Sequence, residues 1–163
     1  MIIALSTVLM VLGAMVDVLD LSVCALASLF VAFVYIEIGS PYTFCVWLAT
    51  SLLTFVFFPG SIIWLEYLLV FGIYPILKAY IEKLPRKVWI ILKLAYANLI
   101  FIALIFLVEL ILKVPFFGFD NLWIKVGVYA LLNVAFFAYD IFITVLLRFY
   151  FERLRNRFKH LLK

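Results

Sequence analysis

The charged residues and Pro/Gly pairs of this sequence are grouped in short breaks that separate six long apolar segments. These segments are approximately Ile2–Val16, Leu21–Ile38, Tyr42–Phe58, Ser61–Leu84, Val88–Leu112 and Leu122–Tyr150. A hydrocarbon core about 30 Å thick is crossed by about 20 helical residues, so each segment is predicted to cross a bilayer as a helix. The strands of a membrane barrel would alternate apolar and polar residues, and these segments do not. The sequence therefore predicts an all-α polytopic integral membrane protein with six transmembrane helices.

Composition leaves little of the chain for structure outside the bilayer. Hydrophobic residues make up 70% of the 163 residues, against 13 basic and 9 acidic side chains. The breaks are too short for a linker, so residues 1–163 are expected to form one domain of antiparallel neighbouring helices. A soluble enzyme and a nucleic-acid binder are both excluded by this composition, and the lipid bilayer is the first partner to expect.

The basic residues predict an orientation. If the N-terminus is inside, every Lys and Arg except Lys113 and Lys125 lies near a cytoplasmic helix end, where such residues are retained. Both termini are therefore predicted to be cytoplasmic in a multi-pass protein of the inner (plasma) membrane. Residues 151–163 combine basic side chains with apolar ones at three- and four-residue spacing, which predicts an amphipathic tail that lies on anionic lipid or docks a partner.

Catalytic chemistry has little basis in these residues. The single histidine, His160, is in the charged tail, and the sequence contains no phosphate-binding loop or nucleophile motif. Cys24 and Cys45 lack the CxxC spacing of metal and redox sites and are expected to be buried thiols. We predict no catalytic residue, no metal site and no cofactor, and the chain is expected not to be an enzyme.

Three charged residues fall at one predicted depth. Lys78, Lys93 and Asp140 each lie about 9–12 Å from the inner end of their helix at 1.5 Å per residue. We expect an ion pair between Asp140 and Lys93, with Lys78 joining it or extending to the cytoplasm. Such a buried cluster is either a structural contact between helices or part of a transport pathway.

Two amides lie deeper on the last two segments. Asn98 and Asn133 are near mid-membrane, where amides commonly hydrogen-bond between helices. They either join the two helices or contact a ligand.

A group of acidic and aromatic residues is predicted at the outer side. Asp20 is expected to be the N-cap of the second helix. Glu66 lies inside the fourth segment beside Trp64, where a carboxylate needs a cation or water. The aromatic loop 116–123 either closes over a pocket or forms an interfacial belt, with Glu66 then facing water. The predicted ligand-binding residues are Glu66, Trp64, Asn98, Asn133, Glu109, Phe117 and Trp123.

The whole-chain pattern resembles a known family of transport proteins. Six short helices in one chain, Ala4-Leu-Ser, the stretch Leu21-Ser-Val-Cys-Ala-Leu-Ala-Ser28 and the turn Glu37-Ile-Gly-Ser-Pro41 are similar to the substrate-capture (S) components of energy-coupling-factor vitamin transporters. The resemblance implies a pocket for a vitamin-like molecule, with a membrane coupling protein and ATPase subunits as partners. Where that family has an alanine pair on its first helix, this chain has Ala4 and Val8.

Two other resemblances give different expectations. Phe71-Gly-Ile-Tyr-Pro-Ile-Leu-Lys78 and Asn133-Val-Ala-Phe-Phe-Ala-Tyr-Asp140 are similar to stretches of bacterial membrane proteins to which no activity is assigned. In size and helix number the chain also resembles the rod-shape-determining MreD family, which implies a non-catalytic scaffold for cell-envelope assembly. The sequence thus predicts a membrane-embedded small-molecule-binding subunit, with the scaffold as the alternative.

Overall fold

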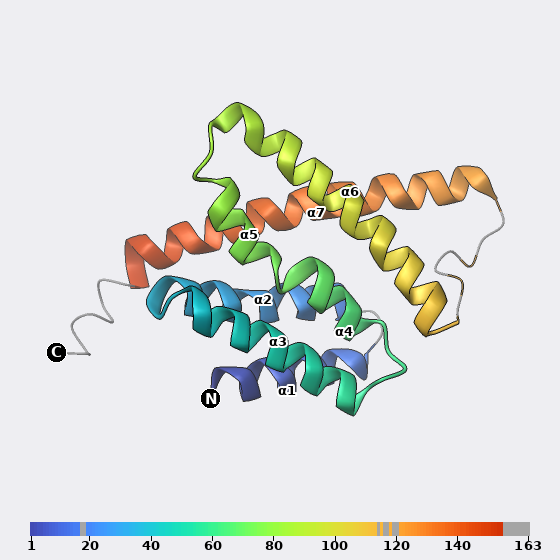
Figure 1. The fold of residues 1–163 in the computed structure, drawn as a ribbon, viewed down its shortest axis with the longest axis horizontal. Helices are drawn as coiled ribbons and strands as arrows, with labels where there is room; N and C mark the ends of the chain where they lie inside the picture. Colours follow the sequence, from blue (N-terminus) through green and yellow to red (C-terminus); the bar gives the residue numbers. More distant parts are fainter. Residues whose placement is uncertain (17–18, 114, 116–117, 119–120, 155–163) are drawn as a thin grey trace. The chain divides into compact units, whose positions relative to one another are not determined.

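Every regular element in the described part of the chain is a helix (Figure 1). The computed structural model describes residues 1–16, 19–113, 115, 118 and 121–154. The elements in chain order are α1 (Ile2–Ala14), α2 (Asp20–Glu37), α3 (Ser40–Phe57), α4 (Ile63–Glu66), the π-helix η2 (Tyr67–Phe71), α5 (Tyr74–Ile81), α6 (Arg86–Ile111), α7 (Leu122–Phe149) and the π-helix η3 (Tyr150–Leu154). The predicted all-α fold class is confirmed.

The contacts divide the chain after residue 120 into two compact units. The first unit holds α1 to α6, and the second holds α7 with η3. Within the first unit, α1, α2 and α3 pack against one another, and α4 contacts all three of them. The buried polar side chains of this four-helix bundle form the candidate site. That residues 1–163 form one domain stays a prediction.

The helices differ in whether they are long enough to cross a bilayer. Five helical stretches of the described chain are long and apolar enough to cross a bilayer. They are α2, α3, the run Ile63–Ile81, α6, and α7 with the start of η3. By contrast, α1 has 13 residues, which rise about 20 Å, short of a hydrocarbon core about 30 Å thick. Five of the six predicted segments therefore have the length of a membrane span. The crossing by the first segment and the cytoplasmic position of both termini stay predictions.

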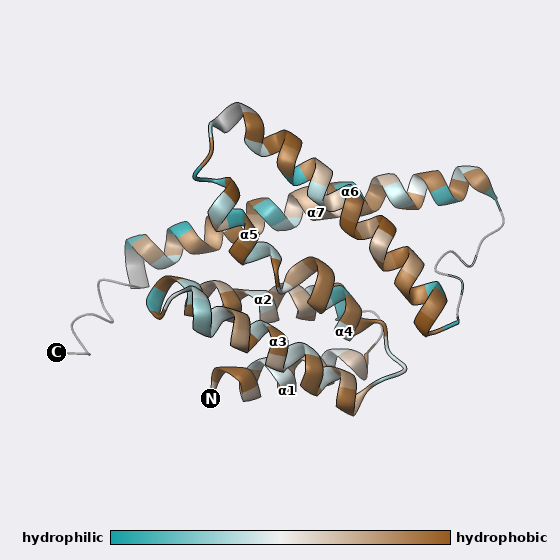
Figure 2. Ribbon diagram, viewed as in Figure 1, coloured by the Kyte–Doolittle hydropathy of each residue, from teal (hydrophilic) through white to brown (hydrophobic). Residues whose placement is uncertain are grey.

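The first unit buries small polar side chains within a largely apolar core and exposes large apolar side chains, unlike a water-soluble bundle. On α1, Ser6 and Thr7 are buried. On the same helix Leu5, Val8 and Leu12 are each more than half exposed, and Figure 2 shows apolar residues (brown) in every helix. Water would favour burial of the leucines and exposure of the hydroxyls. A bilayer favours this arrangement, because small polar residues pack between helices while large apolar ones meet lipid.

The interior face of α3 carries a stripe of hydroxyl side chains. The buried residues of this stripe are Thr43, Thr50, Ser51 and Thr54. Three of them donate to the carbonyl four residues back in the same helix: Thr43 to Gly39 (2.8 Å), Ser51 to Trp47 (2.9 Å) and Thr54 to Thr50 (2.8 Å). Such a bond satisfies a hydroxyl that has no access to water. The Thr50 hydroxyl makes no such bond in the described structure.

Two glycines allow the helices of the first unit to pack closely. A Cβ atom on Gly13 would lie 2.8 Å from Cγ1 of Val23, so only glycine lets α1 approach α2 at this point. Gly39 has a φ of 115° as the N-cap of α3, a conformation that residues with a Cβ rarely adopt. The turn between α2 and α3 is consequently tight, as the short break in the sequence predicted.

Candidate functional site

The fourth apolar segment, Ile63–Ile81, has the length of a membrane span, and we call it the fourth span. Its helix is broken in the middle. After α4 the backbone becomes π-helical from Tyr67 to Phe71, and the N–H of Gly72 donates to the Tyr67 carbonyl at 2.7 Å, five residues back. Helix α5 then begins with Pro75 in its first turn, where the missing proline N–H is tolerated. Single π-turns inside α-helices are rare and are frequently found at functional sites.

Side chains from two other helices complete the hydrogen bonding of this break. The indole Nε1 of Trp47 on α3 donates to the Leu68 carbonyl at 3.0 Å. The hydroxyl of Tyr96 on α6 donates to the Leu69 carbonyl at 2.8 Å. A carbonyl released from the helix ladder inside a bilayer must find a partner within the protein. Trp47 and Tyr96 therefore join α3 and α6 to the broken helix.

Several buried polar atoms near this break have no hydrogen-bond partner in the described structure. They belong to α1, α3 and the segment from α4 into η2, elements that pack against one another. We call them the unpaired polar set: Ser6 Oγ, Thr7 Oγ1, Thr50 Oγ1, Trp64 Nε1, Glu66 Oε2 and Tyr67 Oη. Each such atom costs free energy if it stays unpaired away from water, about 1–3 kcal/mol from mutational data.

The acidic, thiol and hydroxyl side chains around Glu66 interact electrostatically with one another. Asp20 on α2 interacts with the Glu66 carboxylate. The Cys24 thiol interacts with Glu66 and with the Tyr67 hydroxyl, and its Sγ lies 3.7 Å from the Ile63 carbonyl. Tyr67 in turn interacts with Thr50 across the α3 interface. The start of α2, the middle of α3 and the junction of α4 with η2 thus bring acidic, thiol and hydroxyl groups into one region.

Asp20 does not cap α2 as predicted. The N-cap is Leu19, and no side chain makes the capping hydrogen bond. Asp20 is already the first helical residue, where its charge favours the helix N-terminus through the macrodipole without accepting a capping bond. Its carboxylate also lies within electrostatic reach of the Glu66 carboxylate.

Two of the predicted ligand-binding residues, Glu66 and Trp64, belong to the same short helix, α4. The Trp64 ring packs edge-on against Phe55 of α3, with ring centroids 4.8 Å apart. Asn98 on α6 donates from Nδ2 to the Leu94 carbonyl at 2.8 Å. Glu109 is exposed near the end of α6, about 17 Å along the helix from Asn98 at 1.5 Å per residue. Those two residues are too far apart to line one small site.

The remaining predicted ligand residues lie elsewhere. Asn133 and Trp123 belong to α7, in the second unit. Asn133 Nδ2 donates to the Tyr129 carbonyl at 3.1 Å within that helix, and the Trp123 backbone N–H donates to the N-cap side chain of Asn121. Phe117 lies outside the described residues. The role of these three residues in ligand binding stays a prediction.

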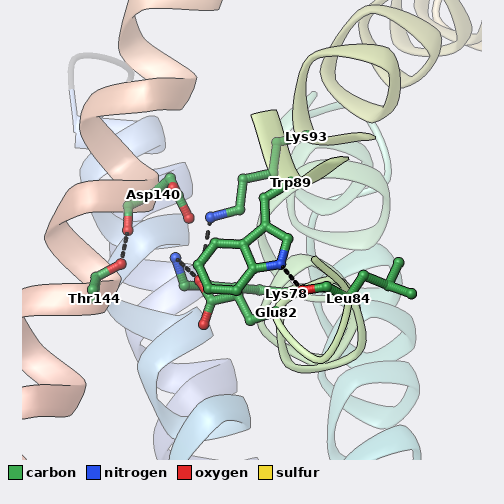
Figure 3. Close-up of polar contacts among 7 residues, drawn as sticks. All are labelled: Lys78, Glu82, Leu84, Trp89, Lys93, Asp140 and Thr144. Atoms are coloured by element: carbon green, nitrogen blue, oxygen red, sulfur yellow. Dashed lines mark hydrogen bonds and ion pairs between the residues drawn. The ribbon is translucent and has the colours of Figure 1, made fainter. Parts of the chain in front are cut away.

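A second polar cluster lies at the far end of the broken span (Figure 3). Lys78 Nζ on α5 and Lys93 Nζ on α6 lie 3.1 and 3.2 Å from the same Glu82 Oε1. Both lysines are buried, and their ammonium groups lie 6.0 Å from the Tyr74 ring and 5.9 Å from the Trp89 ring, respectively. One carboxylate therefore joins two helices through two cations.

Sequence reasoning missed Glu82 in this cluster. The sequence contained a signal for Glu82, because its four-residue spacing from Lys78 places opposite charges on one helix face. Asp140 belongs to α7 in the second unit, where its carbonyl oxygen accepts a hydrogen bond from the Thr144 hydroxyl at 2.8 Å (Figure 3). The expected pair between Asp140 and Lys93 stays a prediction.

The cysteines differ from each other. Cys24 is buried as predicted, but Cys45 on α3 is exposed. The prediction was wrong for Cys45 because an apolar segment does not indicate which of its faces turns inward. Among the described residues, no group of three or more His, Cys, Asp or Glu side chains is placed to hold a metal ion.

Comparisons with protein-family models, with curated proteins and with solved structures found no match for this chain.

Proposed function

We propose that this chain is a non-catalytic membrane subunit that binds a small, vitamin-like molecule and works with other chains as a transporter. The observation that carries the proposal is the unpaired polar set beside the broken fourth span. Its hydroxyl, indole and carboxylate groups belong to helices that pack against one another in a bundle that exposes large apolar side chains. A small molecule with hydrogen-bonding groups would pair these atoms.

The energetic argument rests on the bilayer as solvent. Each unpaired buried polar group costs free energy that water would recover for a soluble protein but that lipid does not. The rest of the bundle avoids this cost, since the neighbouring hydroxyls on α3 bond to their own helix. The unpaired groups gathered on these packed helices of the first unit are therefore well explained by a partner that is bound there during function.

The broken helix supports the same function. Membrane transporters commonly form their substrate sites from discontinuous helices, because such helices expose polar backbone and termini where no lipid reaches. The segment from Ile63 to Ile81 contains such a break. By the resemblance to S components, a membrane coupling protein and ATPase subunits would supply the energy for transport.

Native mass spectrometry of the protein purified from its own host tests the binding function. We expect a retained small molecule in the wild-type protein and its loss in Tyr67→Phe and in Thr50→Val. Thr54→Val is the matched control, because the Thr54 hydroxyl is already bonded to the Thr50 carbonyl. A fully folded protein without any retained molecule, or equal retention in all four proteins, would contradict the proposal.

Co-purification tests the partners. Recovery of a membrane coupling protein with its ATPases would support the transporter subunit. Recovery of cell-wall synthesis proteins in their place would favour the alternative of an MreD-like scaffold in the cell envelope.

A further inference from the structure

The Glu66 carboxylate is the one member of the unpaired polar set that can carry a full charge. Its Oε2 atom is buried and accepts no hydrogen bond in the described structure. Lys78 and Lys93 form their ion pairs with Glu82. The nearer lysine, Lys78, is about 18 Å from Glu66 along the span at 1.5 Å per residue. No side chain of that cluster neutralises Glu66.

The surroundings of Glu66 make its charge more costly. Asp20 places a second acidic group within electrostatic reach of the carboxylate. Two like charges in a poorly solvated region repel each other, and removal of a carboxylate from water costs several kcal/mol unless a cation or hydrogen bonds replace the water. A positive charge at this position would reduce both costs at once.

An independent observation points to a ligand at the same place. The Tyr67 side chain is 0% exposed, and its polar neighbours are the Thr50 hydroxyl and the Cys24 thiol. Neither meets the geometry of a hydrogen bond to the Tyr67 hydroxyl in the described structure. Cys24 interacts with Glu66 as well. Hydroxyl oxygens and one carboxylate are ligands that suit a hard cation or an ammonium group.

We propose that the junction of α4 with η2, where it packs against α2 and α3, binds a monovalent cation, with the Glu66 carboxylate as counter-ion and the Tyr67 and Thr50 hydroxyls as further oxygen ligands. This inference rests on the proposed binding function and specifies its chemistry. The cation is either a free alkali-metal ion or the ammonium group of a small organic molecule. In both forms Asp20 adds a favourable long-range attraction.

Thermal unfolding of the full-length protein in nanodiscs of neutral lipid tests this inference. The background salt is N-methylglucamine chloride, replaced stepwise at constant ionic strength by sodium, potassium or methylammonium chloride. We expect a saturable rise in the unfolding temperature with at least one of the three small cations, because a ligand that binds only the folded state stabilises it. Sodium or potassium would identify the metal form and methylammonium the organic form.

Variants assign the effect to the site. Glu66→Gln should raise the half-saturating cation concentration about tenfold or more, as loss of a charged partner does, and Tyr67→Phe should raise it by a smaller factor. Glu109→Gln is the control, because Glu109 is acidic but exposed at the other end of a different helix. If Glu66→Gln does not fold, Tyr67→Phe still tests the site. Equal responses to all salts, or a half-saturating concentration unchanged in both site variants, would overturn the inference.

The same samples separate the two proposals. A retained molecule that is neutral or anionic in native mass spectrometry would overturn the cation inference and leave the binding subunit in place. A saturable cation effect without any retained small molecule would support the cation site and contradict the vitamin-like ligand.

Discussion

The Trp47 indole N–H donates to the Leu68 carbonyl at 3.0 Å, and this bond joins α3 to the point where the fourth span is broken. The break releases backbone carbonyls from the regular helix ladder, and lipid offers them no partner. Trp47 thereby stabilises the π-turn inside a bundle with an apolar surface. The geometry of the candidate site depends on this contact, because Tyr67 is the first residue of the π-turn.

Trp47→Phe should destabilise the protein by about 1–3 kcal/mol, since it leaves a buried carbonyl without its donor. SDS-induced unfolding in mixed micelles measures this change. Trp89→Phe is the matched control: Trp89 donates to the Leu84 carbonyl at 2.6 Å in an exposed turn, where water replaces the lost bond. A loss in Trp89→Phe as large as that in Trp47→Phe would contradict this account.

Gly72→Ala should also destabilise the break. A Cβ atom at this position would lie 2.5 Å from Trp47 Cδ1 and 2.8 Å from the Tyr67 carbonyl oxygen, so backbone or indole must shift. Overpacking of this kind costs about 1–3 kcal/mol. Gly127→Ala on α7 meets nothing within 4 Å and should be neutral or stabilising by up to about 1 kcal/mol, as expected for a helix interior. The unfolding midpoints of both variants provide the comparison.

Thr50→Val and Thr54→Val should change stability in opposite directions. Valine has the shape of threonine without the hydroxyl, so Thr50→Val removes an unpaired buried donor and should stabilise the ligand-free protein by about 1 kcal/mol. Thr54→Val removes a hydroxyl that bonds the Thr50 carbonyl and should cost about 0.5–1 kcal/mol. Calorimetric or SDS unfolding of ligand-free protein distinguishes the two signs. Destabilisation by Thr50→Val would indicate that its hydroxyl already has a partner.

Glu82→Gln should weaken the contact between α5 and α6. The substitution removes the carboxylate that both Lys78 and Lys93 contact. Because the Glu82 side chain is 34% exposed, we expect a loss of about 1–3 kcal/mol, below the cost of breaking a fully buried pair. In a Lys78→Met background the loss should shrink, and a double-mutant cycle measures the coupling. Additive effects of the two substitutions would show that the ion pair between Lys78 and Glu82 contributes nothing to the free energy of unfolding.

The number of crossings decides on which sides the termini lie. Six crossings place both termini on one side, whereas five place them on opposite sides. The basic residues favour a cytoplasmic C-terminus, and the bilayer can thin around a short helix at modest cost. We therefore expect reporters fused to either end to be active in the cytoplasm. A periplasmic N-terminus with a cytoplasmic C-terminus would show that α1 does not cross.

Much of the secondary structure followed directly from the sequence. Gly39 with Pro41, and Pro59 with Gly60, separate runs of apolar residues long enough to span a bilayer, and the helices begin and end within a few residues of those breaks. Local propensity and length suffice for this, because backbone in lipid must form its hydrogen bonds within its own segment. Glu66 also stood out in the sequence, because a carboxylate inside an apolar run is costly.

The inward face of each helix was decided only by the tertiary structure. Segments that are apolar on all sides carry no periodic signal of burial, so Cys45 was expected inside and is exposed. Which hydroxyls are satisfied, how Trp47 reaches the broken span and how Glu82 joins Lys78 to Lys93 all depend on contacts between segments distant in the chain. The sequence thus determined which residues form helices, and packing determined which of their few polar atoms stay unpaired in the described structure.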